Sequence, residues 1–246
     1  MDSFGLSYAF LLIVPSELLS LVLDFLDVSS VFSLSRTSNV YLCAICPKHD
    51  ILTIRLDTVS NGHTNLFKWL IDDKELNSVI NGLYIKEAIE NGHLEILKYL
   101  RTNLCDDGWC WSIPCTIAAK HGHLKILKYL HENGCDWTKY AYIGAANRGH
   151  LEIIKYLHEN NCPNHICTCD EAAANGHLDI LKYLYENNIC HCDDITTTKA
   201  AENGHLEVLK YLHENGCSWN TYTYRTAMDH KQLDILKYLN ENGCPQ

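Results

Sequence analysis

One ten-residue phrase recurs through most of the sequence. It reads NGHLEILKYL at residues 91–100. Near-copies or weaker copies occupy residues 61–70, 121–130, 148–157, 175–184, 203–212 and 230–239. The glycine of each phrase, or the residue in its place, follows the previous one after 27–30 residues. Repetition at such a period is typical of chains that stack one small structural unit upon the next.

One full copy, residues 138–161, shows what the unit is. It reads TKYAYIGAANRGHLEIIKYLHENN. In its second half Leu151, Ile154 and Leu157 recur at three-residue steps while Glu152 lies on the other side, which is the pattern of an amphipathic helix. In its first half the small Ala145 and Ala146 would allow another helix to approach closely. The unit is therefore predicted to be a pair of helices of about ten residues each.

Gly149 separates the two predicted helices, and glycine readily adopts the left-handed conformation that ends a helix. Helices shorter than ~12–15 residues are marginal in water, so neither helix is expected to be stable alone. The copies must stack to bury enough apolar surface. The first and last copies depart most from the phrase, as expected of end units with one solvated face.

Composition excludes several classes of protein. The chain is 47% hydrophobic and 20% charged, which is typical of a folded globular protein, and its net charge of −10 argues against a nucleic-acid partner. The apolar run Tyr8–Val14 is too short to span a membrane and lacks the basic stretch of a signal peptide. We therefore expect neither a membrane nor secretion, and we expect the 13 cysteines to be reduced thiols in an intracellular compartment.

The recurring pattern AAxNGHLEILKYLHENGC resembles the ankyrin repeat, in which two short antiparallel helices precede a hairpin loop. The resemblance implies an all-α, ankyrin-like solenoid of about seven short repeats over residues 51–246, acting as a monomer that binds a protein partner on its concave face. The sequence also departs from the family. Its period of 27–30 residues is shorter than the usual 33, and only Pro114 remains of the Thr-Pro-Leu-His motif. We therefore expect truncated hairpin loops.

Residues 1–50 contain no copy of the phrase and are expected to form a small helical segment. The order Pro-x-Glu-Leu-Leu from Pro15, with apolar residues continuing to Leu26, resembles the F-box, the module that binds the adaptor subunit of cullin–RING ubiquitin ligases. The resemblance implies adaptor contacts by Pro15, Leu18, Leu19, Val22 and Leu23. The alternative is that these helices only cap the first repeat, leaving a stand-alone binding scaffold.

Cysteine and histidine side chains are frequent enough to raise the question of a metal site. The densest string contains Cys162, His165, Cys167 and Cys169. The repeat register offers packing roles instead. Cysteines at 105, 135, 162, 217 and 244 all follow the second helix, where a small buried residue fits, and Cys190 lies one residue further on. Cys169 shares the core-facing position of Cys115, and Cys167 shares its position with Leu83, Ile113, Tyr140, Ile195 and Tyr222. We expect no metal.

Catalysis is not indicated either. The histidine after each turn glycine recurs in six equivalent copies, which favours a structural role such as bonding loop carbonyls. No phosphate-binding loop or nucleophile motif is present in the sequence, so neither enzymatic activity nor a cofactor is expected. The tyrosine of each Lys-Tyr-Leu could stack on bases, but the absence of a basic groove favours a half-buried seam between repeats.

Residues that vary between otherwise constant copies are the candidates for recognition. Tryptophan and tyrosine are enriched at binding hot spots. The candidates of this kind for contact with the target are Trp109, Trp111, Trp137, Trp219 and Tyr222. The alternative for the tryptophans is local packing, with the indole lying over the helix of the next repeat.

The sequence therefore predicts a protein–protein interaction module that recruits a target to a cullin–RING ligase. The combination of an F-box-like start with repeats ending in HENGC resembles proteins encoded by large DNA viruses of protists. That resemblance implies a location in the cytoplasm or nucleus of the host cell.

Overall fold

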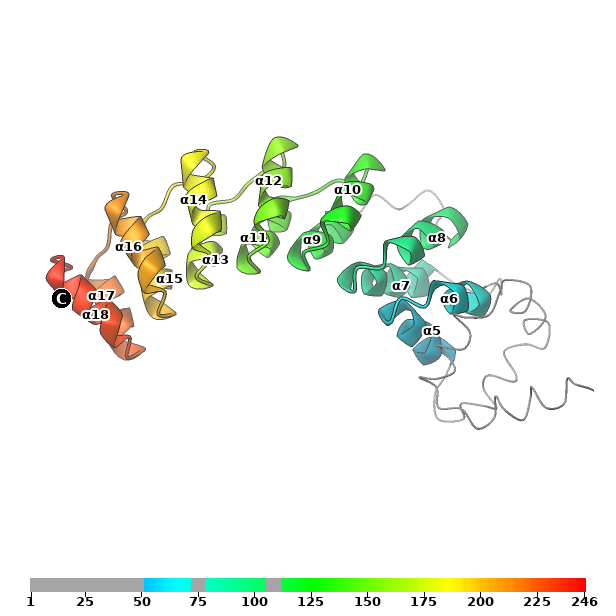
Figure 1. The fold of residues 1–246 in the computed structure, drawn as a ribbon, viewed down its shortest axis with the longest axis horizontal. Helices are drawn as coiled ribbons and strands as arrows, with labels where there is room; N and C mark the ends of the chain where they lie inside the picture. Colours follow the sequence, from blue (N-terminus) through cyan, green and yellow to red (C-terminus); the bar gives the residue numbers. More distant parts are fainter. Residues whose placement is uncertain (1–50, 72–77, 105–111) are drawn as a thin grey trace, which may run out of the picture. The chain divides into compact units, whose positions relative to one another are not determined.

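The computed structural model describes residues 51–71, 78–104 and 112–246, and these residues form helices but no strand (Figure 1). The helices make seven pairs, as the repeats predict. They are α5 (Ile51–Ser60) with α6 (Thr64–Ile71), α7 (Ser78–Glu90) with α8 (Leu94–Leu104), α9 (Ser112–Lys120) with α10 (Leu124–Glu132), α11 (Lys139–Asn147) with α12 (Leu151–Glu159), α13 (Cys167–Ala174) with α14 (Leu178–Glu186), α15 (Asp194–Glu202) with α16 (Leu206–Glu214), and α17 (Thr221–Asp229) with α18 (Leu233–Glu241). None of these helices is both long and apolar enough to cross a membrane.

The helices fall into two compact units, one containing α5–α8 and the other α9–α18. Each short connection from a second helix to the next first helix in the larger unit lacks strands, as at residues 160–166 between α12 and α13. The predicted truncation of the hairpin loops is thereby confirmed for the described residues. The fold is an all-helical ankyrin-type solenoid.

The second helix of each pair supplies most of the large core side chains. In α12, Ile153, Ile154 and Leu157 are buried, and the equivalent residues of α10, α14 and α16 are buried too. Leu151, which the sequence places on the apolar stripe with Ile154 and Leu157, is only half-buried. The buried stripe is thus displaced toward Ile153 because the helix faces both its own partner and the next repeat.

The first helices pack closely against one another. Ala145 and Ala146 are fully buried, and a Cβ on Gly144 would lie 3.1 Å from Cβ of Lys120 on the preceding first helix. Consecutive second helices make far less contact than consecutive first helices do. This difference curves the α9–α18 unit, so that α9, α11, α13, α15 and α17 lie along its inner side (Figure 1).

The turn within each repeat ends the first helix as predicted. At α11 the Gly149 backbone has φ +79°, in the left-handed region. The His150 N–H donates to the Ala145 carbonyl at 3.0 Å, and the Gly149 N–H donates to the Ala146 carbonyl at 3.4 Å. These two bonds satisfy carbonyls that the end of a helix would otherwise leave unpaired.

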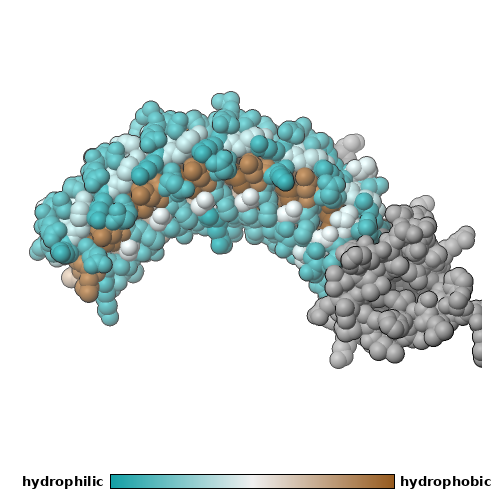
Figure 2. Space-filling model, in the orientation of Figure 1, coloured by the Kyte–Doolittle hydropathy of each residue, from teal (hydrophilic) through white to brown (hydrophobic). Residues whose placement is uncertain are grey.

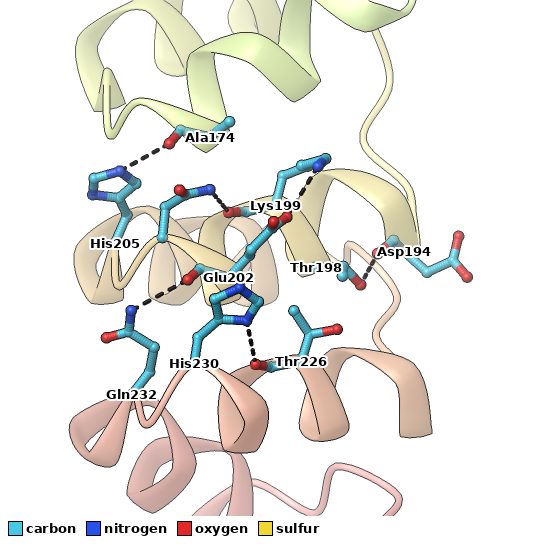
Figure 3. Close-up of polar contacts among 10 residues, drawn as sticks. Ala174, Asp194, Thr198, Lys199, Glu202, His205, Thr226, His230 and Gln232 are labelled. Atoms are coloured by element: carbon cyan, nitrogen blue, oxygen red, sulfur yellow. Dashed lines mark hydrogen bonds and ion pairs between the residues drawn. The ribbon is translucent and has the colours of Figure 1, made fainter.

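The histidine after this glycine binds the preceding repeat. His150, His177 and His205 each place Nε2 3.0–3.3 Å from a backbone carbonyl at the end of the previous first helix. These carbonyls belong to Lys120, Asn147 and Ala174. In the last repeat Gln232 takes over the role and donates through Nε2 to the Glu202 carbonyl at 3.2 Å (Figure 3). The predicted carbonyl-bonding role of the turn histidines is confirmed at these positions.

The cysteines that follow the second helices are buried, as predicted. They are Cys135, Cys162, Cys217 and Cys244, with Cys190 one residue further on, whereas Cys105 lies outside the described residues. Burial raises the pKa of the Cys115 thiol and of the Cys162 thiol to about 12, so both remain protonated at neutral pH.

The expectation that every cysteine is a reduced thiol is wrong at four positions. Cys169 is disulfide-bonded to Cys190, and Cys192 to Cys217, with Cα atoms 6.5 and 5.6 Å apart. Both distances lie in the range that disulfides require. Each bond closes one repeat, because its cysteines lie before or within the first helix and after the second. The loop that carries Cys190 is one residue longer than usual, and this displaces its cysteine from the position that Cys135 and Cys162 occupy.

Candidate functional site

A row of large apolar side chains is exposed along the first helices of the α9–α18 unit. Ile113, Tyr140, Ile195 and Tyr222 are 63%, 57%, 54% and 67% exposed. In α13 the same repeat position is filled by the half-buried Cys167, which follows the exposed Ile166. We call Ile113, Tyr140, Cys167, Ile195 and Tyr222 the inner apolar row. Figure 2 shows hydrophobic patches that recur from repeat to repeat along this unit within a mostly hydrophilic surface; Tyr140 and Tyr222 do not contribute to them, because the hydropathy scale of that figure ranks tyrosine as hydrophilic.

Helix geometry explains why this row is exposed. In α11 the next two residues, Ala141 and Tyr142, are buried against the neighbouring helices. Residues three and four positions after Tyr140 share its side of the helix, and these are the half-buried Ile143 and Gly144. The packing role that the sequence analysis gave to Cys167 and its equivalents is therefore wrong for this position. It faces away from the core.

The row ends in a groove between α15 and α17, with a volume of about 450 Å³. Ten residues line it, five from α15, four from α17 and His230 just after α17, and Figure 3 shows some of them. They are Asp194, Ile195, Thr198, Lys199, Glu202, Tyr222, Arg225, Thr226, Asp229 and His230. The inner face is thus hollowed where two first helices meet.

Polar contacts fix the α15 side of the groove. The Lys199 ammonium donates to the Glu202 carboxylate at 2.9 Å, and this bond raises the pKa of Lys199. The Thr198 hydroxyl donates to the Asp194 carbonyl at 2.6 Å (Figure 3). It also lies 2.9 Å from the Thr223 hydroxyl of α17. Hydroxyls bonded in this way let the two helices meet without an unpaired polar group.

The start of α17 is fixed by its own cap. Asn220 accepts the backbone N–H groups of Tyr222 and Thr223, in a capping box with the Thr223 side chain. Its amide also donates to Oδ2 of Asp194 at 2.6 Å. Because this cap holds the first turn of α17 beside α15, Tyr222 projects from a defined backbone.

Acidic side chains lie beside the middle of the inner apolar row. Asp170 accepts from the Thr196 hydroxyl at 2.7 Å, and Glu171 accepts from the Asn147 amide at 2.6 Å. Burial raises the pKa of Asp170, and the negative charges of Asp193 and Glu171 raise it further, against the lowering effect of the Thr196 bond. The inner face at α13 and α15 therefore presents several carboxylates held by neutral partners.

The predicted target-binding residues are found in different places. Trp137 stacks on His131 with ring centroids 3.7 Å apart and meets Tyr156 edge-on at 6.0 Å. Trp219 does the same with His213 and Tyr238, at 3.8 and 6.1 Å. Both tryptophans thus pack locally beside second helices but remain half-exposed, so their contact with a target stays a prediction. Tyr222 lines the groove, and Trp109 and Trp111 lie outside the described residues.

The tyrosines of the Lys-Tyr-Leu phrase form the predicted seam between repeats. Tyr156, Tyr183, Tyr211 and Tyr238 are half-buried. The hydroxyls of Tyr183 and Tyr238 lie 3.0 Å from Nδ1 of His158 and His213, each on the preceding second helix. These contacts join neighbouring second helices and explain why the phrase keeps its tyrosine.

The residues predicted to bind an adaptor, Pro15, Leu18, Leu19, Val22 and Leu23, lie outside the described residues. Sequence reasoning also missed the exposure of Ile113, Tyr140 and Ile195. No clear signal was present in the sequence, because the buried position of Cys115, Tyr142, Cys169 and Thr197 varies from copy to copy just as the exposed one does.

Comparison with known proteins agrees with this geometry. A family model for ankyrin repeats in three copies matches residues 115–196 and 171–245, and a second ankyrin-repeat model matches residues 85–131. No curated protein matches the sequence. Among solved structures, the human ASB11 ankyrin repeat domain is similar with a TM-score of 0.56 and 22% identity, covering 67% of this chain and 84% of that one. The matched models cover more than half of the sequence, and the chain belongs to the ankyrin-repeat family.

Proposed function

We propose that this chain holds a target protein on the inner face of its first helices and, through residues 1–50, delivers the target to a cullin–RING ubiquitin ligase. Ankyrin repeats are protein–protein interaction modules and in general have no enzymatic activity. The observation that carries the proposal is the inner apolar row, where Ile113, Tyr140, Ile195 and Tyr222 are more than half exposed. Exposed apolar surface rimmed by charge is typical of a protein-binding site.

The groove between α15 and α17 is the expected centre of the contact. It brings the exposed Tyr222 and Arg225 together, and these two residue types are enriched among side chains that dominate binding energy. Asp229 and His230 lie at its rim and can select partners by charge and hydrogen bonding.

Recruitment to the ligase is supported by the sequence between Pro15 and Leu26. Its resemblance to the F-box makes Pro15, Leu18, Leu19, Val22 and Leu23 the adaptor contacts. The further resemblance to F-box and ankyrin proteins of large DNA viruses of protists would place the complex in the cytoplasm or nucleus of a host cell.

Target binding is tested by affinity purification with mass spectrometry from a eukaryotic cell lysate. The double variant Tyr140→Ala/Ile195→Ala should lose proteins that the unchanged chain captures, because it removes two central side chains of the row. Glu207→Ala is the matched control, since Glu207 is exposed on the second helix α16. If both variants capture the same proteins as the unchanged chain, the inner face is not the binding surface.

Recruitment is tested separately with the purified adaptor subunit. The intact chain should bind it, and Leu18→Asp/Leu19→Asp should not. Equal binding by both, or binding by neither, would contradict the recruiting role. In that case deletion of residues 1–50 should cause aggregation if the segment only caps the repeats.

A further inference from the structure

The pair Asn-Gly recurs in the turns of this chain, and asparagine is among the thermally labile residues. When glycine follows, its backbone nitrogen can attack Cγ of the asparagine, because no side chain hinders the approach. The new N–C bond closes a succinimide ring, the amide nitrogen leaves as ammonia with the glycine proton, and water then opens the ring to aspartate or isoaspartate. The pair occupies turns within a repeat and also turns after a second helix, which we call closing turns. They begin at Asn61, Asn91, Asn175 and Asn203 and at Asn133, Asn215 and Asn242, respectively.

The folded turns hold this pair in a geometry that does not react. The ψ angles of Asn215 and Asn242 are 13° and 18°, so the glycine nitrogen nearly eclipses the backbone nitrogen of the asparagine and points away from its side chain. Nδ2 of each asparagine also donates to the carbonyl four residues earlier, at 2.7 and 2.8 Å. Attack therefore requires a local opening that rotates the Cα–C bond and breaks this hydrogen bond. The reaction rate at each turn should follow how easily that turn opens.

The turns within a repeat are covered by the repeat that follows. A Cβ on Gly176 would lie 2.7 Å from Nδ1 of His205, so the ring lies directly on this turn. The same ring places Nε2 3.0 Å from the Ala174 carbonyl, one residue before Asn175. The pair at Asn175 therefore opens only when the two repeats separate, which disrupts packing as well as hydrogen bonds.

The closing turns have no such cover. A Cβ on Gly134, Gly216 or Gly243 would meet nothing within 4 Å. Each closing turn also lies at the end of a second helix, and helix ends fray while the rest of the repeat stays folded. A closing turn should therefore open more often than a turn within a repeat.

Two closing turns share the sequence ENGC but differ in what holds them. The main-chain carbonyl of Asn215 accepts from the Tyr185 hydroxyl at 2.8 Å, and Cys217, two residues later, is disulfide-bonded. At the equivalent turn no hydroxyl of the described residues bonds to the Asn242 carbonyl, and Cys244 is a free thiol with only weak S–H contacts. Rotation of the Asn215 Cα–C bond must move a carbonyl that the preceding repeat holds, whereas rotation at Asn242 need not. The turn at Asn242 is therefore the easier of the two to open.

We propose that Asn242 is a site of spontaneous deamidation in the folded chain, that Asn215 is a slower site, and that Asn175 reacts only after its repeat separates from the next. This inference goes beyond the proposed function and does not depend on it. The reaction places a carboxylate at the C-terminal end of α18, where the helix dipole is already negative, and removes the hydrogen bond to the Tyr238 carbonyl. Deamidation should therefore weaken the last turn of α18.

The test incubates the purified full chain at neutral pH and follows each site by peptide mapping with mass spectrometry, which detects the hydrolysed amide and separates isoaspartate. Asn242 should react first and Asn215 later, and Asn175 should stay intact longest. Tyr185→Phe should speed the reaction of Asn215 about two- to tenfold, the factor that one hydrogen bond supplies, and leave Asn242 unchanged. The variant keeps the ring that meets Tyr211 edge-on. Reduction of the disulfide should likewise speed Asn215 and leave Asn242 unchanged.

The chain unfolded in denaturant is the control. There the three sites should react at similar rates, because they share the Asn-Gly pair, and a ranking that persisted would come from the sequence and overturn the inference. Equal rates at Asn242 and Asn175 in the folded chain would overturn it too, as would an unreactive Asn242 in the folded chain when the unfolded chain reacts. An unchanged rate at Asn215 in Tyr185→Phe, with the circular dichroism spectrum intact, would contradict the protection assigned to the Tyr185 bond.

Discussion

The glycine in the turn within each repeat both adopts a left-handed backbone and leaves room for a histidine of the next repeat. Substitutions at Gly149 and Gly216 separate these two effects. Gly149 and Gly216 both have left-handed backbones, with φ of +79° and +81°. A Cβ on Gly149 would lie 2.7 Å from Cε1 and 2.9 Å from Nδ1 of His177, whereas a Cβ on Gly216 would meet nothing within 4 Å. Alanine at either position carries the same backbone penalty, and only at Gly149 does it also displace a side chain.

The expected magnitudes follow from these contacts. An L-residue in the left-handed region costs about 1–2 kcal/mol, and Gly216→Ala should destabilise the chain by about that amount or slightly less. Gly149→Ala must also push the His177 ring away and break its 3.3 Å bond to the Asn147 carbonyl. Such a bond contributes about 0.5–1.5 kcal/mol, so with the lost packing the total should reach about 2–4 kcal/mol.

Chemical denaturation followed by circular dichroism measures both variants, and a third variant isolates the cause. In a His177→Ala background, Gly149→Ala should cost no more than Gly216→Ala does, because the ring that it displaces is gone. Equal losses for Gly149→Ala and Gly216→Ala in the unchanged background would refute the steric argument and leave only the backbone effect.

Three other predictions concern stability. Ile154→Ala should lower the free energy of unfolding by about 2–5 kcal/mol, because Ile154 is fully buried. Glu152→Ala removes only an exposed ion pair and should change it by less than about 0.5 kcal/mol. Similar losses for the two variants would contradict the helical register. Breaking the Cys192–Cys217 disulfide with Cys192→Ser should lower the free energy of unfolding by about 3 kcal/mol, in a chain-entropy estimate for its loop, and so lower the denaturation midpoint. Non-reducing mass spectrometry should find both linkages, and a midpoint unaffected by reductant would show that the bonds are absent. Burial lowers the pKa of His150, against the raising effect of its bond to the Lys120 carbonyl, so the folded state favours the neutral ring. The stabilisation that His150 contributes to the folded state should therefore be complete above the ordinary pKa of 6.5 and decline as the pH falls toward the lower pKa of the folded state. His150→Gln should flatten this part of the stability profile, and an unchanged profile would count against it.

The helix pairs could be predicted because local signals agreed. Leu151, Ile154 and Leu157 gave the period of a helix, Gly149 gave its boundary, and the repetition itself required stacking. The role of the histidines was also accessible, since six equivalent copies point to the framework and not to a single reactive site.

The inner apolar row could not be predicted in the same way. A short first helix contacts neighbours on three sides, so the periodicity of one sequence does not show which side is left open. Ile113 and Ile195 look like core residues for this reason. Their exposure follows only from the close approach of the first helices to one another.

The disulfides depended on a still finer detail. Cys135 and Cys190 both follow a second helix, yet only Cys190 is bonded to a cysteine of its first helix. The extra residue in its loop changes where the sulfur lies, and spacing alone does not give that position. For the tryptophans the sequence left two roles open; Trp137 stacks locally on His131, and its contact with a target stays a prediction.

The bond from each turn histidine has a consequence for how this chain can diverge. Its acceptor is always a main-chain oxygen, so it makes no demand on the side chain of the residue that supplies it. For His93, His150, His177 and His205 those residues are Ser60, Lys120, Asn147 and Ala174, and Glu202 accepts from Gln232, which replaces the histidine in the last repeat. These five residues have little in common chemically. Glu202 also borders the groove. Mutation can therefore rewrite the surface offered to a partner one residue at a time, while the fastening between adjoining repeats stays the same.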